Sequence, residues 1–267
     1  MKNCLSIAGS DCSGGAGIQA DIKTFSALGC FGMSVIVSVV AENTSRVISI
    51  QNVNEQVIKD QIDAVFEDIE VDGVKVGMLS GKETMKAVAE KLREYKPKTV
   101  VIDPVMVAKG GYALMQSDAL ETLKKEIIPL STLLTPNIPE SETITGMKIE
   151  AIEDMKAAAK KIHEMGAENV LIKGGHLEGD ALDILFDGKK YYSFTNKRIN
   201  TKNTHGTGCT LSSAITANLA NGMDLPKAVE EAKKYVTQAI KYSLNIGRGH
   251  GPTNHFFEFY NMKGKAL

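Results

Sequence analysis

Residues 5–28 read LSIAGSDCSGGAGIQADIKTFSAL and contain an apolar run, a glycine-rich turn and an amphipathic stretch in direct succession. Residues 5–8 predict a buried strand, and the spacing of apolar residues in 17–28 predicts a helix. The same order, an apolar run and then an amphipathic stretch, recurs along the chain. Because strands and helices alternate in this way, the sequence indicates a mostly parallel sheet with helices on both faces.

The alternation continues to residue 172 and then changes. Further strands are predicted at 34–40, 73–76, 99–102, 132–135 and 169–172, and helices between them at 54–68, 81–95, 117–128 and 152–165. After Lys173, residues 181–186 and 191–194 flank Asp187-Gly188, which is a typical hairpin turn. Two more helices are predicted at about 207–221 and 226–243, with no linker or repeat, so residues 1–267 are expected to form one domain.

The composition is that of an ordinary globular protein. The 267 residues are 43% hydrophobic and 24% charged, which excludes a disordered, fibrous or disulfide-rich miniprotein. Lys and Arg total 31 against 32 Asp and Glu, so no nucleic-acid partner is expected. No apolar run has the length of a membrane span or signal peptide, and no membrane partner is expected. The scattered cysteines form no C-x-x-C pair, which favours a cytoplasmic protein.

Five of the predicted strands are followed by polar or glycine-rich residues. These residues are 9–17 (GSDCSGGAG), 77–78 (GM), 103–104 (DP), 136–140 (PNIPE) and 173–176 (KGGH). In open α/β sheets, ligands bind beyond the carboxyl ends of the strands, and parallel strands place those ends at one edge. The pooled carboxylates, amide, lysine and glycine-rich loops predict a site for a phosphorylated ligand with a cation.

A second glycine-rich turn, 204–210 (THGTGCT), leads directly into an apolar-periodic helix. Such a turn aims free N–H groups and the positive end of the helix dipole at one point, which predicts an anion site. Cys209 falls in the first turn of this helix, where the pKa of a thiol is usually lowered. The alternative is that Cys209 is a small buried residue without a chemical role.

Asp21 lies within the apolar stripe that Ile18, Ile22 and Phe25 form on the first predicted helix. A carboxylate facing the core is costly unless it is paired or hydrogen-bonded, so Asp21 is a candidate functional residue. The alternative is a first-turn carboxylate that the helix dipole favours.

Asn137 and Glu140 fall at the start of another helix, where they either cap the helix or hold a hydrated Mg²⁺. Asp103 ends an apolar strand and fits the same magnesium role. Lys173 ends a buried strand before two glycines and is either a phosphate partner or a solvated lysine. The histidines show neither H-E-x-x-H nor i, i+4 spacing, so no zinc site is predicted.

Read together, these motifs resemble one family. They are 7–11 (IAGSD), 13–21 (SGGAGIQAD), 75–79 (KVGML), 103–106 (DPVM), 135–137 (TPN) with Glu140, 173–176 (KGGH) and 200–211 (NTKNTHGTGCTL). In this order they resemble the hydroxymethylpyrimidine/phosphomethylpyrimidine kinases of thiamine biosynthesis over nearly the whole chain. The resemblance implies a ribokinase-like three-layer α/β/α sandwich with a mostly parallel central sheet. It also implies a homodimer that phosphorylates 4-amino-5-hydroxymethyl-2-methylpyrimidine to the monophosphate and then to the pyrophosphate, with ATP and Mg²⁺.

The resemblance also implies roles for single residues. Gly206, Thr207 and Gly208 would form the anion hole. Cys209 would stand where most ribokinase relatives have an aspartate base, and it would act either as a partly ionised base or by orienting the substrate hydroxyl group. Asn137, Lys173, Thr207 and Gly208 would contact ATP, while Asp103 and Glu140, with Asn137, would place Mg²⁺ through water. Gly9, Asp21, Glu42, Met78 and Val105 would line the pyrimidine pocket, and residues 108–111 would form a mobile lid.

Glu42 departs from the family, which usually has glutamine at this position. Glutamine offers a donor and an acceptor to a ring nitrogen and the adjacent amine, whereas an ionised glutamate only accepts. Either the carboxyl group or the pyrimidine nitrogen must therefore carry a proton. We expect Glu42 still to contact the aminopyrimidine edge, with a pH-dependent Michaelis constant.

Three other functions remain open at this point. The nearest is a pyridoxal/pyridoxine kinase of the same fold, whose substrate lacks the 4-amino group that Glu42 would contact. A sugar or nucleoside kinase of this fold is disfavoured by Cys209 in place of aspartate. A non-catalytic protein that binds a pyrimidine or nucleotide would differ from all of these in ATP turnover.

Overall fold

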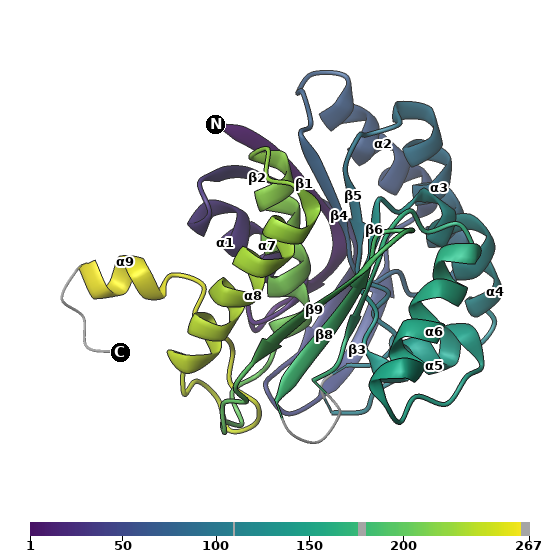
Figure 1. Ribbon diagram of the computed structural model, residues 1–267. Helices are drawn as coiled ribbons and strands as arrows, with labels where there is room; N and C mark the ends of the chain where they lie inside the picture. The colour runs from purple at the N-terminus through teal and green to yellow at the C-terminus, as the bar shows by residue number, and fades with distance from the viewer. Residues whose placement is uncertain (109, 176–179, 263–267) are drawn as a thin grey trace.

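The strands of the described chain pair in one nine-stranded sheet, in the order β3-β2-β1-β4-β5-β6-β7-β8-β9 (Figure 1). The computed structural model describes residues 1–108, 110–175 and 180–262. The strands are β1 Lys2–Asp11, β2 Cys30–Glu42, β3 Val47–Asn52, β4 Gly73–Val76, β5 Val100–Ile102, β6 Leu133–Leu134, β7 Val170–Lys173, β8 Ala181–Phe186 and β9 Tyr191–Asn196. Those from β2 to β7 in this order are parallel, whereas β3, β8 and β9 are antiparallel additions at the edges.

Helices cover both faces of this sheet (Figure 1). One face carries α1 Gly17–Ala27, α7 Thr207–Ala220 and α8 Leu225–Lys241. The other carries α2 Glu55–Phe66, α3 Lys82–Tyr95, α4 Leu120–Thr122, α5 Ile138–Thr145 and α6 Ile152–Glu164, and α9 Phe257–Met262 follows α8. No helix within the described ranges combines the length and apolar character that a membrane crossing requires.

Strand β5 shows why the central strands are apolar at every position. Val100 and Ile102 join the core cluster under the helices on one face, and Val101 joins the cluster on the other. All three side chains are at most 3% exposed. A strand that is buried on both faces is a continuous apolar run, which confirms the predicted three-layer α/β/α architecture.

Two local predictions were wrong. The helix expected at 117–128 is broken into α4, a π-helical turn at Leu123–Ile127 and a 3₁₀ turn at Ile128–Leu130. Pro129 explains the break, because proline removes a donor and its ring clashes with the carbonyl group four residues earlier. Strand β3 was missed because it is a mostly exposed edge strand, with Ile48 62% exposed, and lacks a buried run.

The chain order of the strands creates a switch point beside β1. Strand β1 pairs in parallel with β2 on one side and with β4 on the other, so the crossovers leave in opposite directions. The ladder between β1 and β2 is irregular between Ala8 and Gly9, where the first glycine-rich loop begins. Ligands bind at such a switch point in open α/β sheets, and the predicted site residues lie around this edge.

Candidate active site

Asp103 and Lys173 form an ion pair where β5 and β7 end. Lys173 Nζ lies 2.6 Å from Asp103 Oδ1, which also accepts a hydrogen bond from Thr135 Oγ1 at 3.2 Å. The two charged side chains are 15% and 2% exposed, so Lys173 is not a solvated lysine. Burial acts to lower the pKa of Lys173, but the carboxylates of Asp103 and Glu140 outweigh it and the pKa is raised. The end of the sheet therefore holds a fixed positive charge.

The N-terminus of α7 meets this ion pair at Gly208. A Cβ atom on Gly208 would lie 3.3 Å from Asp103 Oδ2 and 3.4 Å from Lys173 Nζ, so only glycine leaves both groups open. Gly206 precedes the helix with φ +78°, a left-handed conformation that favours glycine. Amides in the first turn have no acceptor within their own helix, so those of Gly208 and Cys209 are suited to an anion, whereas the Thr207 amide donates to the Thr204 carbonyl oxygen at 3.4 Å.

Asn137 and Glu140 cap α5 reciprocally. Asn137 Oδ1 accepts a hydrogen bond from the Glu140 amide at 2.9 Å, and Glu140 Oε2 accepts one from the Asn137 amide at 2.8 Å. The capping alternative is thus confirmed for both residues. Burial raises the pKa of Glu140 to about 7; the charge of Lys173 opposes this shift and that of Asp103 reinforces it. At neutral pH, Glu140 is divided between the acid and the carboxylate.

Cys209 occupies the first turn of α7, as predicted, but the pKa of its thiol is not lowered. Loss of hydration raises the pKa to about 11, although Lys75 and a hydrogen bond from the Gly17 backbone act to lower it. Asp21 and Asp103 raise it further. The expectation of a lowered pKa was wrong because desolvation outweighs the helix dipole, and the thiol is protonated at neutral pH.

Asp21 faces the core and is paired there with Lys75, a partner that the sequence analysis missed. The Lys75 ammonium lies 2.9 Å from Asp21 Oδ1 and 2.8 Å from Oδ2, and both side chains are fully buried. Ser6 and Ser213 donate hydrogen bonds to the same carboxylate at 2.6 and 2.7 Å. A lysine within the apolar strand GVKV was the signal for this pair. Asp21 is thus held behind the site rather than at its surface.

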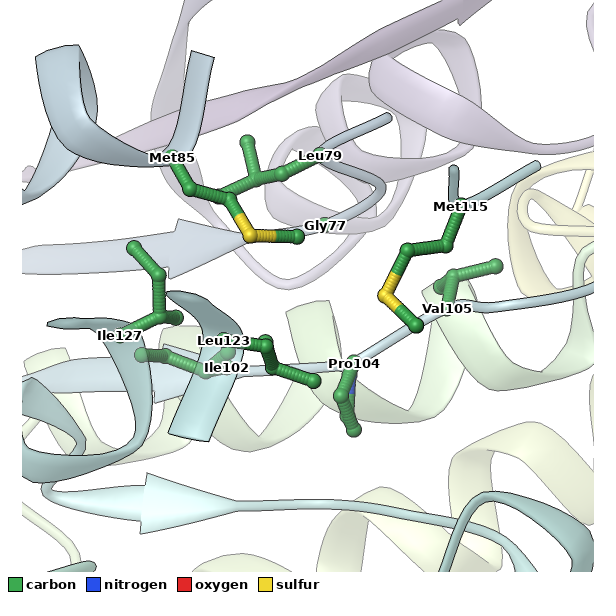
Figure 2. A pocket seen from close by; sticks show the side chains of 9 residues that line it. All are labelled: Gly77, Leu79, Met85, Ile102, Pro104, Val105, Met115, Leu123 and Ile127. Atoms are coloured by element: carbon green, nitrogen blue, oxygen red, sulfur yellow. The ribbon is translucent and has the colours of Figure 1, made fainter. Parts of the chain in front are cut away.

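The residues expected around a pyrimidine lie on neighbouring strand ends. A Cβ atom on Gly9 would lie 2.5 Å from Met78 Cε, so these two residues are in contact. Val105 is half-buried on the loop after β5. Figure 2 shows Val105 with Gly77 and Met115 among the residues that line an apolar cavity. The volume of this cavity is about 10 Å³. That volume admits no more than one water molecule, so the cavity is a packing gap and not the binding site.

Glu42, Asp11 and His205 form a cluster in which one side-chain N or O atom from each residue lies within 4.8 Å of those of the other two. His205 Nε2 lies 2.8 Å from Asp11 Oδ2, although these residues are 194 positions apart. Burial acts to raise the pKa of Asp11, but hydrogen bonds from His205 and Ser13 hold it well below its usual range. Burial and the charge of Asp11 raise the pKa of Glu42 to about 7. The sequence analysis gave Asp11 and His205 no role.

The two glycine-rich loops interlock around His205. A Cβ atom on Gly15 would lie 2.3 Å from His205 Cδ2, and one on Gly206 would lie 1.8 Å from the Gly15 carbonyl oxygen. On its other side, the His205 amide donates a hydrogen bond to Gly251 O at 3.1 Å. The loop at 247–252, to which the sequence analysis gave no chemistry, thus braces the anion-binding loop.

The predicted lid is only partly within the described residues. Lys109 lies outside them, whereas Val107 and Ala113 form an antiparallel bridge on either side. A Cβ atom on Gly110 would lie 3.6 Å from the Ser45 carbonyl oxygen, so this turn reaches the turn that follows Glu42. Opening and closing of this segment stays a prediction.

Comparisons with known proteins agree with this geometry. A sequence model of the phosphomethylpyrimidine kinase family matches residues 11–254. The chain is 53% identical over 262 residues to the thiamine biosynthesis bifunctional protein ThiED of Geobacter sulfurreducens, covering 98% of this chain and 54% of that protein. It is 50% identical over 258 residues to the hydroxymethylpyrimidine/phosphomethylpyrimidine kinase of Bacillus subtilis, covering 96% of this chain and 95% of that protein. This chain therefore spans about half of the first relative and nearly all of the second.

A solved structure of pyridoxal kinase is also similar. The pyridoxal kinase of Bacillus subtilis, crystallised with ADP, has a TM-score of 0.90 and 39% sequence identity, covering 96% of this chain and 98% of that chain. Shape alone therefore does not separate the two kinds of kinase. Sequence identity is higher with the two relatives above, at 53% and 50%, than with this pyridoxal kinase, at 39%.

Proposed function

The chain belongs to the phosphomethylpyrimidine kinase family, with its ribokinase-like fold, and from this premise we propose that it is an ATP-dependent kinase of hydroxymethylpyrimidine. It phosphorylates 4-amino-5-hydroxymethyl-2-methylpyrimidine to the monophosphate and then to the pyrophosphate. The observation that carries the proposal is the meeting of the Asp103–Lys173 ion pair with the first turn of α7 at Gly208. A phosphoryl group transferred at this point faces a cation and free amides together.

Phosphoryl transfer depends mainly on positioning and on electrostatic stabilisation. We assign the anion hole to the first turn of α7, formed by Gly206, Thr207 and Gly208. Lys173 contacts the phosphates of ATP, and Asn137 lies beside it, since these two residues form an isolated bridge. The amides and the ammonium are already in place before ATP binds, so they stabilise developing charge without reorganisation.

Cys209 acts in this proposal by orienting the substrate hydroxyl group. With a pKa of about 11, its thiol is protonated at neutral pH, and a neutral thiol is too weak a base to take the hydroxyl proton. A loose transition state demands little of a base, because the hydroxyl proton is lost late. The structure thus favours the orienting role over the base role that the resemblance implied.

The residues at the strand ends fit a magnesium ion. Asp103, Asn137 and Glu140 offer carboxylate and amide oxygens, the donor set that Mg²⁺ prefers, and Asp103 Oδ2 faces Gly208 rather than Lys173. When bound, the ion neutralises charge on the phosphates of ATP. Burial raises the pKa of Glu140 despite the charge of Lys173, and a bound cation would favour its ionised form.

The pyrimidine ring is placed against Gly9, Met78 and Val105, with Glu42 at its amino edge. Asp21 supports this wall from behind through Lys75 rather than by contact. Pyridoxal kinase is the second candidate, favoured by the TM-score of 0.90 to that enzyme. A pyridoxal ring lacks the 4-amino group, so Glu42 favours the pyrimidine.

Product analysis by mass spectrometry tests the proposal. The purified protein is given Mg-ATP with hydroxymethylpyrimidine in one reaction and with pyridoxal in another, and Lys173→Met, with its much lower expected turnover, serves as the control. The monophosphate followed by the pyrophosphate is the expected result. Pyridoxal phosphate alone would assign the protein to the second candidate, and no ATP turnover with either ligand would make it a binding protein.

The proposal extends to the state of the protein in the cell. One nine-stranded sheet supports a single kinase domain over residues 1–267, and four free cysteines suit a reducing cytoplasm. We expect a homodimer, as the family resemblance implies, and sedimentation equilibrium measures it directly.

A further inference from the structure

Glu42 stands among charged groups from two other parts of the chain. Asp11 comes from the end of β1, and His205 comes from the loop before α7. One side-chain oxygen or nitrogen atom of each lies within 4.8 Å of a carboxyl oxygen of Glu42. Within the described part of the chain, Asp11 disfavours the ionisation of Glu42 and His205 favours it. Cys12 also touches Glu42, but its Sγ donates only to the backbone carbonyl at 3.0 Å.

The two carboxyl groups of the cluster are not equivalent. Asp11 accepts hydrogen bonds from the amides of Ser13, Gly15 and Ala16 at 2.7, 3.0 and 2.8 Å, and it contacts His205 as well. Glu42 has a half-buried side chain, and among the described residues no such set of donors faces it. When two carboxyl groups lie close together, the proton settles on the group that is less well solvated. In this cluster that group is Glu42.

We propose that Asp11 and His205 are positioning residues that together set the proton on Glu42: Asp11 holds the proton there and His205 opposes it, so that the carboxyl group presents an O–H donor and a C=O acceptor to the aminopyrimidine edge. This inference rests on the proposed function. A neutral acid then matches the ring nitrogen and the exocyclic amine as an amide does. A negatively charged glutamate would match the amine alone.

Under this proposal, substrate binding requires a proton on Glu42 or on the ring nitrogen, and it therefore depends on pH. Above the pKa of Glu42, which is about 7, the free protein must take up one proton to bind the ring. The Michaelis constant for hydroxymethylpyrimidine therefore rises about tenfold per pH unit above that value and is constant below it. The slope is the same whether the shared proton rests on Glu42 or on the ring nitrogen in the complex.

The test compares the pH profile of the Michaelis constant in four proteins. In the unaltered protein the constant rises above pH of about 7, and in Glu42→Gln it is independent of pH, because the amide needs no proton. The pH at which the constant begins to rise is the break in this profile. Asp11→Asn moves the break to lower pH, since it removes the negative charge beside Glu42. His205→Asn moves the break to higher pH, since it removes the imidazole that favours ionisation of Glu42.

Cys12→Ser is the matched control, because it alters a neutral neighbour of Glu42 without changing the charge. A purely structural role for Asp11 and His205 would weaken binding at every pH and leave the break where it is. Breaks that stay fixed in both variants, or a sloping profile in Glu42→Gln, would overturn the proposal.

A second measurement needs no turnover and separates this proposal from the proposed function. The Glu42 side-chain carboxyl carbon is titrated by ¹³C NMR in the protein without substrate, its signal being assigned by its loss in Glu42→Gln. A midpoint near 7 that moves down in Asp11→Asn and up in His205→Asn supports the cluster even if the substrate proves to be pyridoxal. A midpoint in the ordinary range of glutamate would refute it.

Discussion

Glu42 and Glu140 stand at opposite ends of the candidate site and share a pKa of about 7, but their neighbours differ. Glu42 lies beside Asp11 and an imidazole, at the end where the ring is proposed to bind. Glu140 lies near Asp103 and Lys173, at the end where the phosphates and the cation are proposed to bind. Burial is the largest cause of both pKa shifts. The two glutamates therefore differ in the ligand that their neighbours favour, not in the cause of the shift.

Two carboxyl groups with the same pKa can therefore bind ligands that favour different protonation states. A neutral ring that needs a donor stabilises the protonated form of Glu42 and raises its pKa on binding. A cation stabilises the ionised form of Glu140 and lowers its pKa on binding. The substrate end is therefore expected to take up a proton and the phosphate end to release one.

The largest effect is expected from the Lys75–Asp21 pair, which lies behind both ends. Lys75→Met leaves Asp21 as an unpaired buried charge, and breaking such a pair costs about 3–5 kcal/mol. The free energy of unfolding, from urea titration, measures the loss. The double variant Lys75→Met/Asp21→Leu regains most of it, since no charge is left buried. An unchanged stability in Lys75→Met would show that this pair does not support the two ends.

The next effect separates the two ends by kinetics. Lys173→Met removes the cation that faces Gly208, and loss of one such group costs about 10²–10³-fold in kcat. The Michaelis constant for the pyrimidine changes little, because the ring binds at the other end. Steady-state rates with each substrate varied in turn measure both constants.

Lys160→Met is the control for this change, since Lys160 is an exposed lysine on α6. A Lys173→Met variant that changed only the Michaelis constant for the pyrimidine would mean that the two ends are assigned the wrong way round.

A smaller effect is expected at Cys209, between the two ends. Because burial raises the pKa of the thiol to about 11, alkylation of Cys209 by iodoacetamide rises with pH throughout the range from neutral to pH of about 9. Cys209→Ser keeps a hydroxyl group that orients the substrate and loses no more than about tenfold in kcat. Mass spectrometry of the modified peptide measures the extent of alkylation at each pH. A plateau in alkylation below pH of about 8 would show that Cys209 is a thiolate at neutral pH and would support its role as a base.

The sequence predicted those features that depend on local periodicity. Asp21 falls inside an apolar stripe, and its burial followed from that position. Asn137 and Glu140 have the spacing of a capping box, and the structure forms one. The strand ends that carry Asp103 and Lys173 were found because parallel strands share one edge.

The sequence could not predict features that depend on distant contacts. The contact between His205 and Asp11 joins residues 194 positions apart, and that between Lys75 and Asp21 joins residues 54 positions apart. The pKa of Cys209 was predicted in the wrong direction, because its sign depends on desolvation by surrounding elements. The broken helix near Pro129 shows that apolar spacing alone does not reveal a backbone clash.

The comparison of the two glutamates rests on the protons that each ligand exchanges, and calorimetry at pH 7 in two buffers of different ionisation enthalpy measures them. Since both pKa values are about 7, we predict uptake of about half a proton when hydroxymethylpyrimidine binds and release of about half a proton when Mg²⁺ binds. Glu42→Gln abolishes the uptake alone. Proton exchange of the same sign for both ligands, or none for either, would contradict the account.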